Sequence, residues 1–489
     1  MTKSYEELMG AIGRGILFRP ERFRVRDLLS KDTHPRLLVG ERVYTLFDIS
    51  MNGISFFDQS YDSSFRAGDE IPVSLALHDK MMYSGVGRVA RTQSSAKGVR
   101  VGLALTKGFL DINEIRRQDE EARLRRELQS GPVNQLAFIP SPYLEALTRA
   151  VHFVQYYRKS FDRHEARYRS ANIDTTQLAN RGLEAIREPW SEICHAASIA
   201  GLDCLGYPEI MRAAKECTET MLTPLLLDAP MVHRSYTKPL GYPGDYRVMM
   251  YYYDNKLEGG SVFAQVFHKL FIEHPLSNGV RTRCDFVVGL MQKEHDRVIA
   301  TNQGGTFRVT SLGCGPARES AEYIAQRRDW SGDAIWTLID QEDQTLSVAY
   351  NDCHREIAKA GARGRIQCLN VSFSQVLDDP TLVPLSDPQD LIFSVGLFDY
   401  LREVRAQELI GGLYDRLAPG GLLTVGNAAG PNEYSWSPEF ILDWTLIYRT
   451  RDEMLRLTQN LPKGAEIDVV LEPGQAYYFL LIRKHPHAL

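Results

Sequence analysis

The sequence contains no apolar run that approaches the ~20 residues needed to cross a membrane, and its first residues lack the apolar core of a secretory signal. Its seven cysteines are scattered and form no C-x-x-C pair. This spacing argues against a disulfide framework and against a zinc site, and it suits reduced thiols. We therefore expect a soluble, cytoplasmic protein with no membrane span and no metal.

A large excess of charge of one sign is also missing. The net charge of −5 at pH 7 argues against a general nucleic-acid binder. The hydrophobic fraction of 44% is sufficient for globular cores. With domains of about 150 residues as the usual size, the length of 489 residues predicts about three domains. We expect an antiparallel β-barrel at residues 1–110, a helical region at 111–283 and an α/β domain at 284–489.

The first of these parts contains short β runs separated by turn residues, with no helical pattern between them. Such spacing predicts a small antiparallel barrel or sandwich. Two motifs accompany the runs: R-x-x-x-R at Arg22 and Arg26, then D-x-S-x-x-G at Asp48, Ser50 and Gly53.

In order and spacing the two motifs resemble the PilZ domain, a β-barrel family that binds cyclic di-GMP, and the resemblance implies that regulatory ligand here. Guanidinium groups bind phosphate and can bond the Hoogsteen edge of guanine. Asp48 can accept from a guanine amine, and Gly53 permits a backbone turn under the base. Glu21 departs from the family pattern, since members often carry two adjacent arginines there. The alternative is that the arginines are solvated and residues 48–53 form an ordinary hairpin loop.

The middle of the chain has the pattern of a helical region. Residues 111–129 are dense in charge, carry apolar residues at helical intervals and begin with a capping aspartate, which predicts a solvated connector helix. Further helices are predicted at residues 143–168, 176–187, 190–200 and 209–226. This region offers a surface for a protein partner or for a homodimer.

The last part alternates strand and helix patterns, which predicts a doubly wound, Rossmann-like α/β sheet. It begins with an apolar run at 309–312, a glycine turn at 313–315, a helix at 317–327, and a strand at 335–339 that leads to Asp340. A turn of this kind leaves free N–H groups at the helix start and lets a ligand approach the main chain. An acidic residue at the next strand end can accept hydrogen bonds from ribose hydroxyls.

Two cofactor classes use this geometry. Dinucleotide enzymes place a third glycine where Arg318 stands, which weighs against NAD. The segment instead resembles the first motif of class I S-adenosylmethionine (SAM) methyltransferases, and L-x-P-G-G at 417–421 resembles the turn before that family's fifth strand. The resemblance implies SAM as cofactor, held by Gly313, Cys314, Gly315, Asp340, Asn370, Val371, Ser394 and Gly396. The alternative is a βαβ unit with a tight turn and no cofactor.

Residues 238–246, KPLGYPGDY, form a turn-rich loop between helices. Two prolines and two glycines fix its backbone path, and rigid loops often carry function. We interpret the loop as a lid or substrate wall over the sulfonium, with Tyr242, Asp245 and Tyr246 as polar contacts. The alternative is a structural turn.

Methyl transfer from a sulfonium is an in-line displacement in which water must be excluded. A hydroxyl acceptor needs a general base, whereas a carboxylate is ionised near neutral pH. No histidine follows a predicted strand end, which favours a carboxylate acceptor, with Asp245 and Asp399 as alternative bases. The whole chain also resembles proteins that make the methyl ester of 3-hydroxypalmitic acid, which implies a small-molecule acyl substrate.

Three hypotheses remain open: a cyclic di-GMP-regulated small-molecule O-methyltransferase, a protein carboxyl methyltransferase, and a non-catalytic cyclic di-GMP effector. SAM binding separates the third from the other two. Labelled methyl in an organic extract or in a protein precipitate separates the first from the second.

Overall fold

The computed structural model describes residues 22–30, 33–58, 65–78, 80–95, 98–130, 136, 138–204, 206–301, 305–327, 330, 333–371, 376, 387–430 and 433–486. Contacts divide the chain into two compact units, Met1–Asn134 and Gln135–Leu489. The predicted boundary after residue 283 falls within one helix, α12 (Pro275–Thr301). The division into three domains stays a prediction.

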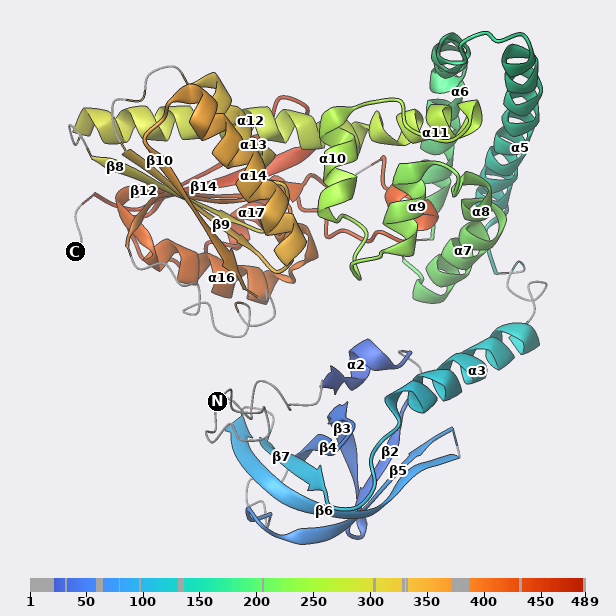
Figure 1. Cartoon of the computed structure of the whole chain (residues 1–489), viewed down its shortest axis with the longest axis vertical. Helices are drawn as coiled ribbons and strands as arrows, with labels where there is room; N and C mark the ends of the chain where they lie inside the picture. The colour runs from blue at the N-terminus through green and yellow to red at the C-terminus, as the bar shows by residue number, and fades with distance from the viewer. Residues whose placement is uncertain are drawn as a thin grey trace, which may run out of the picture. The chain divides into compact units, whose positions relative to one another are not determined.

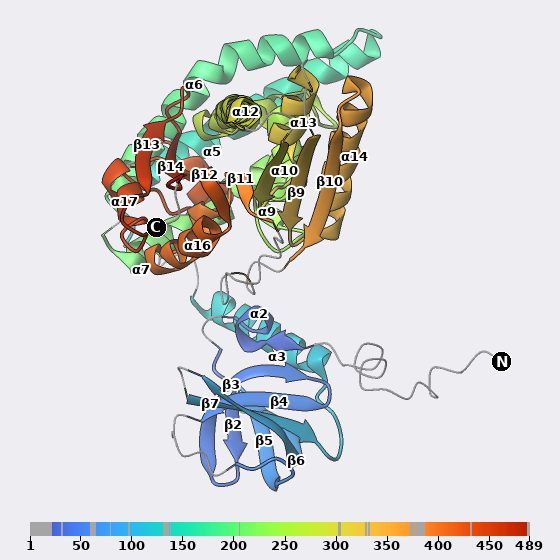
Figure 2. The same ribbon diagram turned by 90° about the vertical axis from the view of Figure 1, so that its left-hand side faces the viewer.

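The first unit is a closed antiparallel barrel of six strands (Figures 1 and 2). The strands are β2 (Arg36–Val39), β3 (Arg42–Ser50), β4 (Gly53–Asp58), β5 (Glu70–Leu77), β6 (Lys80–Ser95) and β7 (Gly98–Leu105). They follow the order β3-β2-β5-β6-β7-β4, and β3 also pairs with β4, which closes the ring. Inward-facing side chains such as Leu37, Ile54 and Phe56 are fully buried, so the interior is a packed core.

Two further elements of this unit lie outside the ring. A short strand β1 (Phe23–Arg24) pairs with β3 and continues into α2 (Val25–Leu28). After the barrel comes the connector helix α3 (Ile112–Ser130), whose start is capped by Asp111 through the N–H of Glu114 at 3.0 Å.

The helix α3 is less solvated than the sequence predicted. Its Asp119 is buried and accepts hydrogen bonds from the backbone N–H of Ser30 at 2.8 Å and from the Ser30 hydroxyl at 2.7 Å. The apolar residues Ile112 and Ile115 belong to the barrel core. The helix is therefore bonded to the segment before the barrel and packed on the barrel.

The second unit begins with a helical region, as predicted. Its helices before α12 are α5 (Ser141–Ser170), α6 (Thr176–Leu202), α7 (Pro208–Met221), α8 (Thr223–Leu226), α9 (Pro230–Thr237), α10 (Tyr246–Asp254) and α11 (Val262–Ile272). The sequence predicted two helices here, at residues 176–187 and 190–200. This division was wrong, because the single helix α6 runs through Pro189. Ile186 and Trp190 are both buried, so packing on either side of the proline offsets the lost backbone hydrogen bond.

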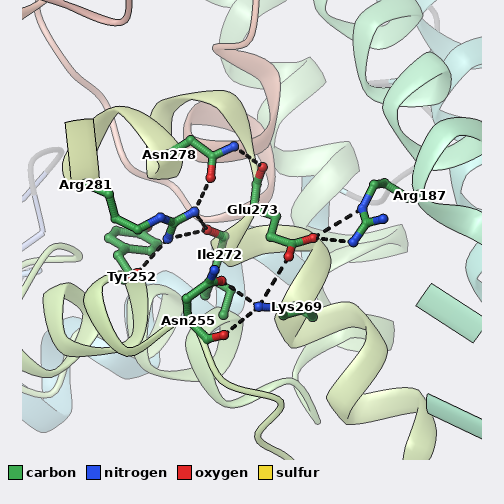
Figure 3. Close-up of polar contacts among 8 residues, drawn as sticks. All are labelled: Arg187, Tyr252, Asn255, Lys269, Ile272, Glu273, Asn278 and Arg281. Atoms are coloured by element: carbon green, nitrogen blue, oxygen red, sulfur yellow. Dashed lines mark hydrogen bonds and ion pairs between the residues drawn. The ribbon is translucent and has the colours of Figure 1, made fainter. Parts of the chain in front are cut away.

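Polar side chains join the ends of α10 and α11 to α12 (Figure 3). Lys269 donates to the backbone and side-chain oxygens of Asn255, the C-cap of α10, at 2.5 and 2.6 Å. Arg281 donates to the backbone oxygen of Ile272, the last residue of α11, at 3.1 Å. These bonds satisfy carbonyl groups that helix ends leave free. They fix the direction in which α12 leaves the helical region towards the sheet.

The rest of the unit is a seven-stranded sheet with helices on both faces (Figures 1 and 2). The strands are β8 (Thr306–Leu312), β9 (Asp333–Asp340), β10 (Gly364–Asn370), β11 (Gln389–Ser394), β12 (Leu417–Ala428), β13 (Glu466–Leu471) and β14 (Tyr477–Arg483). The helices are α12, α13 (Arg318–Gln326) and α14 (Asp343–Ala360) on one face, and α16 (Glu403–Asp415) and α17 (Arg451–Arg456) on the other. Two short helical turns, η3 (Phe398–Tyr400) and η4 (Ser437–Ile441), follow β11 and β12.

The strand order β10-β9-β8-β11-β12-β14-β13 determines where a ligand can bind. The first five strands in this order, from β10 through β9, β8 and β11 to β12, are parallel. Strand β14 pairs antiparallel with β12, and β13 pairs antiparallel with β14. From β8 the chain first proceeds to β9 and β10, and then returns to the other side with β11. In open α/β sheets ligands bind at such a switch point, which here lies at the carboxyl ends of the two central strands, β8 and β11.

The predicted turn at 417–421 is part of β12 instead. The register passes from Gln389 opposite Leu417 to Leu391 opposite Leu422, so the intervening residues bulge out of the ladder. A side chain on Gly421 would lie 2.7 Å from the backbone oxygen of Gln389, which explains the glycine there.

Among the helices that the structure describes, none combines the length and apolar character that a membrane crossing requires.

Candidate functional site

The glycine turn after β8 has an unusual backbone. Gly313, Gly315 and Ala317 all have positive φ, at 66°, 52° and 51°. Glycine adopts positive φ freely, whereas the same backbone conformation at Ala317 costs about 1 kcal/mol or more of strain. The N–H groups of Gly313 and Cys314 both donate to the backbone oxygen of Ile339, at 2.9 and 3.0 Å. The turn is thereby fastened to the end of β9.

Space is open beside this turn. A side chain placed on Gly315 would meet nothing within 4 Å. Cys314 is buried, and its thiol lies 3.4 Å from the backbone oxygen of Gly315. Burial raises the pKa of that thiol, so Cys314 is a neutral packing residue of the turn. The main chain at Gly315 is therefore accessible to a ligand.

The carboxylate of Asp340 lies against the same turn. Its Oδ2 accepts from the N–H of Gly315 at 3.0 Å, and its Oδ1 accepts from the N–H of Glu342 at 3.1 Å. The side chain is buried, and burial raises its pKa while the backbone N–H groups oppose the rise. The two parts of the predicted cofactor site, turn and acid, are thus in direct contact.

The ends of the neighbouring strands complete this edge of the sheet. Asn370 stands opposite Asp340 in the register, is exposed, and donates to the backbone oxygen of Gln341 at 3.0 Å. The N–H of Val371 donates to the backbone oxygen of Asp340 at 3.0 Å. At the end of β11, Ser394 is fully buried, and its hydroxyl has no hydrogen-bond partner among the described residues.

A hydrogen bond, an ion pair and a packing contact link the 238–246 loop to the segment that follows β12. Lys238 donates to the backbone oxygen of Asp443 at 2.8 Å and pairs with its carboxylate at 2.5 Å. Gly244 packs on the indole of Trp444, since a side chain there would lie 2.4 Å from the ring. The indole N–H donates to the hydroxyl of Tyr400 at 2.8 Å, at the end of η3. The loop is therefore held near the carboxyl end of β11.

The three predicted polar contacts of this loop differ in their surroundings. Tyr242 is half-buried, and burial together with the nearby Asp340 and Glu342 raises its pKa, so it lies in the neighbourhood of the acid of the turn. Tyr246 lies under the guanidinium of Arg234, with 5.8 Å between the guanidinium carbon and the ring centroid.

The third contact, Asp245, is committed to structural bonds. It is fully buried and caps α10 by accepting from the N–H groups of Arg247 and Val248, at 3.0 and 3.1 Å. Arg234 donates to both of its oxygens, at 2.9 and 2.8 Å. These contacts favour a structural role over the predicted role as a base.

Asp399 lies deeper, after β11. It is buried, and its Oδ1 accepts from the N–H of Ala428 at 2.7 Å. Burial raises its pKa to about 6, against the opposing effects of that hydrogen bond and of the guanidinium groups of Arg283 and Arg449. A buried acid with such a pKa can hold or release a proton near neutral pH.

Sequence reasoning missed Arg283, which lies near Asp399, and the residues around that arginine. Tyr253 donates to the carboxylate of Glu319 at 3.0 Å, and the guanidinium of Arg283 lies 4.6 Å from the ring centroid of Tyr477. All four side chains are buried or partly buried. One signal was available: on α12, Arg283 falls in register with Val280 and Val287, so it is a charge on an apolar helix face.

A second cluster lies in the first unit, at the predicted nucleotide motifs. Asp48 is buried and accepts from Arg22 at 2.6 Å and from Ser55 at 2.8 Å, and it also pairs with Arg100, which the motifs had not included. Gly53 lies beside this cluster, since a side chain there would be 3.1 Å from a guanidinium nitrogen of Arg22.

Two members of the nucleotide motifs remain. The hydroxyl of Ser50 would lie 3.2 Å from a side chain on Gly53. The side chain of Arg26 is outside the described residues. Four of the five predicted residues, Arg22, Asp48, Ser50 and Gly53, are therefore neighbours.

Comparisons with known proteins give only distant similarities. No protein-family model matches the chain, and no curated protein sequence matches it. Among solved structures it is similar to a protein described as a possible exported protein from Bordetella parapertussis, at 16% identity and a TM-score of 0.37, over 49% of this chain and 79% of that one. It is also similar to the pyocyanin biosynthetic protein PhzM, at 13% identity and a TM-score of 0.33, over 63% of this chain and 99% of that one.

A third similar structure is magnesium protoporphyrin IX methyltransferase from Synechocystis PCC 6803 with bound SAH, at 12% identity and a TM-score of 0.30, over 42% of this chain and 84% of that one. Scores of this size are too low to assign a function, so the assignment below depends on the site itself.

Proposed function

We propose that the second unit is a class I SAM-dependent methyltransferase that transfers a methyl group to an oxygen of a small molecule. The observation that carries this proposal is the contact between Asp340 and the open main chain at Gly315. A buried acid beside a glycine turn suits a nucleoside, because the acid accepts from ribose hydroxyls while the turn admits the rest of the ligand. The strand order places this pair next to the switch point between β8 and β11.

The residues present fit SAM. Asp340 would hold the ribose, Gly313 to Gly315 would hold the methionine part, and Asn370 and Val371 would border the adenine. When bound, SAM supplies an electrophilic methyl group on a positively charged sulfur. Tyr242 and the loop that carries it would exclude water from that position.

We further propose that the acceptor is a carboxylate, in a fatty acid or another small acyl molecule. A carboxylate oxygen attacks with a lone pair it already carries, so no proton has to be removed. The contacts of Asp245 support this choice, because that residue is not free to act as a base. Asp399 is then the remaining candidate base of the sequence prediction, should the acceptor carry a hydroxyl.

We also propose that cyclic di-GMP regulates the protein through the barrel. The specific observation in favour is the meeting of Arg22 with Asp48 and Gly53. Asp48 orients two guanidinium groups, those of Arg22 and Arg100, which can then bind phosphate or guanine. Regulation means a measurable difference in SAM affinity or turnover between the nucleotide-bound and free protein.

The test is calorimetric titration of the full chain with SAM, followed by incubation of cell extract with the protein and methyl-labelled SAM. We expect micromolar SAM affinity, about −8 kcal/mol, and label in the organic extract. Label in the protein precipitate would instead support a protein carboxyl methyltransferase. Absence of SAM binding would leave a non-catalytic cyclic di-GMP effector. Methyl transfer to a small molecule and regulation by cyclic di-GMP both suit a cytoplasmic protein, which we also propose. The helical region is the proposed surface for a protein partner or a homodimer.

A further inference from the structure

Arg283 is a buried cation that has no hydrogen-bond acceptor among the described residues. It projects from α12 with 5% of its surface exposed. Among the residues that the structure describes, none forms a hydrogen bond or an ion pair with it, and its Nε is inaccessible and unbonded. A buried guanidinium in this condition is costly, because it has lost its water without gaining hydrogen bonds.

Arg449 shows what a satisfied buried arginine looks like in the same unit. It is 4% exposed, and it donates to the backbone oxygen of Phe398 at 2.9 Å, to the side chain of Asn427 and to the backbone oxygen of Leu401. Three of its N–H groups are directed at fixed oxygens, so its role is to tie chain segments together. No described residue offers Arg283 such acceptors, which argues against the same role.

The guanidinium of Arg283 reaches the carboxyl end of β11. A side chain on Gly396, two residues after that strand, would lie 3.5 Å from its Nη2. The ring of Tyr477 lies 4.6 Å away on one side and supports it through a cation–π contact. The guanidinium therefore lies at the switch point, where a ligand is expected.

The surroundings keep this group charged. Burial would lower the pKa of Arg283, but the neighbouring Tyr477, Tyr253, Asp399 and Glu319 outweigh that effect and raise it. The carboxylate of Glu319 is already engaged by Tyr253 at 3.0 Å, and no carboxylate oxygen of a described residue lies within ion-pair distance of Arg283. A permanent cation at a binding edge, with N–H donors that no described residue bonds, suits an anion from outside the chain.

We propose that Arg283 binds a ligand carboxylate at the carboxyl ends of β8 and β11. Two parallel N–H···O bonds from one guanidinium match the two oxygens of a carboxylate. The carboxylate comes either from the methionine part of SAM or from the methyl acceptor. The inference rests on the proposed function, since both sources are ligands of that reaction.

The experiment compares Arg283→Met with the wild-type full chain and with Arg449→Met as a control. The first measurement is thermal unfolding without ligand. Arg283→Met removes no hydrogen bond to a described residue and should change the Tm little, whereas Arg449→Met lowers it by leaving several acceptors unpaired. If Arg283→Met lowers the Tm as much as Arg449→Met, the arginine is structural and the inference is overturned. This result does not depend on SAM.

The second measurement is calorimetric binding of SAM and of 5′-methylthioadenosine, which has the same nucleoside but no amino-acid part. A loss of roughly 10- to 100-fold for SAM alone identifies the cofactor carboxylate as the partner. Unchanged affinity for both, with at least tenfold less label transferred to the organic extract, identifies the acceptor carboxylate. Equal weakening of both ligands, or no change in binding and transfer, overturns the inference.

Failure of the wild-type chain to bind SAM rejects the proposed function and removes the site on which the inference depends. The unfolding comparison still shows in that case whether Arg283 has a structural role like that of Arg449. Arg283→Lys is the second variant if Arg283→Met does not fold. It keeps the charge but loses the fork, so we expect an intermediate loss; wild-type behaviour in both binding and transfer would contradict bidentate binding.

Discussion

Replacement of Asp340 by alanine is the sharpest test of the cofactor site. In the free protein the carboxylate accepts two backbone hydrogen bonds, from Gly315 at 3.0 Å and from Glu342 at 3.1 Å. Each carboxylate oxygen has two lone pairs, and only one hydrogen bond is made to each. The carboxylate can therefore accept further hydrogen bonds from ribose hydroxyls. A hydrogen bond to a charged group contributes about 1.5–3 kcal/mol. The substitution should therefore weaken SAM binding roughly 10- to 150-fold.

The assay is isothermal titration of SAM into the variant at constant pH and salt. Asp343→Ala is the matched control, because Asp343 is an exposed acid three residues further on, in the first turn of α14. It changes the charge equally and leaves the turn intact, so we expect near wild-type affinity. Equal affinity of Asp340→Ala and wild type would refute the placement of the ribose. If Asp340→Ala does not fold, Asp340→Asn is measured in its place. It retains one acceptor oxygen, so it should lose less SAM affinity than Asp340→Ala.

Three further predictions concern the barrel, Asp399 and the loop. Arg22→Ala or Arg26→Ala should abolish cyclic di-GMP binding, measured by calorimetry, because each removes a guanidinium group of the motif. Asp399→Asn should raise the Tm at pH 8 and change it little at pH 4. The pKa of Asp399 is about 6 in the folded protein and about 3.9 in the unfolded chain. The wild-type protein therefore loses stability as the pH rises from about 4 to above 6, because Asp399 then ionises in its buried site, and asparagine avoids this loss. Gly244→Ala should cost about 1–3 kcal/mol of folding stability and lower methyl transfer, because the added methyl group overlaps the indole ring 2.4 Å away. Gly289→Ala is its control, since a side chain there meets nothing.

Each of these three has a contrary outcome. Cyclic di-GMP binding retained in both arginine variants would remove the regulatory claim. A Tm difference that is the same at both pH values would show that Asp399 is not titrating in the folded protein between them. Equal effects of the two glycine variants on unfolding and methyl transfer would mean that the contact with Trp444 does not position the loop.

Local patterns in the sequence predicted the elements of the sheet well. Apolar runs bounded by glycine placed β8 and β9 within a few residues, and Asp340 was found because it directly ends a strand. Helix α6 was divided incorrectly at Pro189, because burial of its apolar face on both sides is a tertiary effect.

The functional side chains were harder to predict where they depend on distant partners. Asp245 looked like a free acid, yet it is bonded by Arg234 and by its own helix start. Arg283 and Tyr477 meet from opposite ends of the α/β part, and no local spacing relates them. Arg100 on β7 likewise joins Asp48 on β3 across the intervening strand β4. Sequence spacing predicts what a residue can do locally, whereas its partners follow from the topology.

The fastening of the 238–246 loop has a consequence for turnover. Lys238 is bonded to Asp443 and Gly244 packs on Trp444, so we expect the loop and the segment after β12 to move together. If the loop covers the substrate as proposed, substrate entry and product exit would displace both segments together. Amide protons of the two segments should then exchange with solvent at a common rate, and a ligand that slows one should slow the other equally.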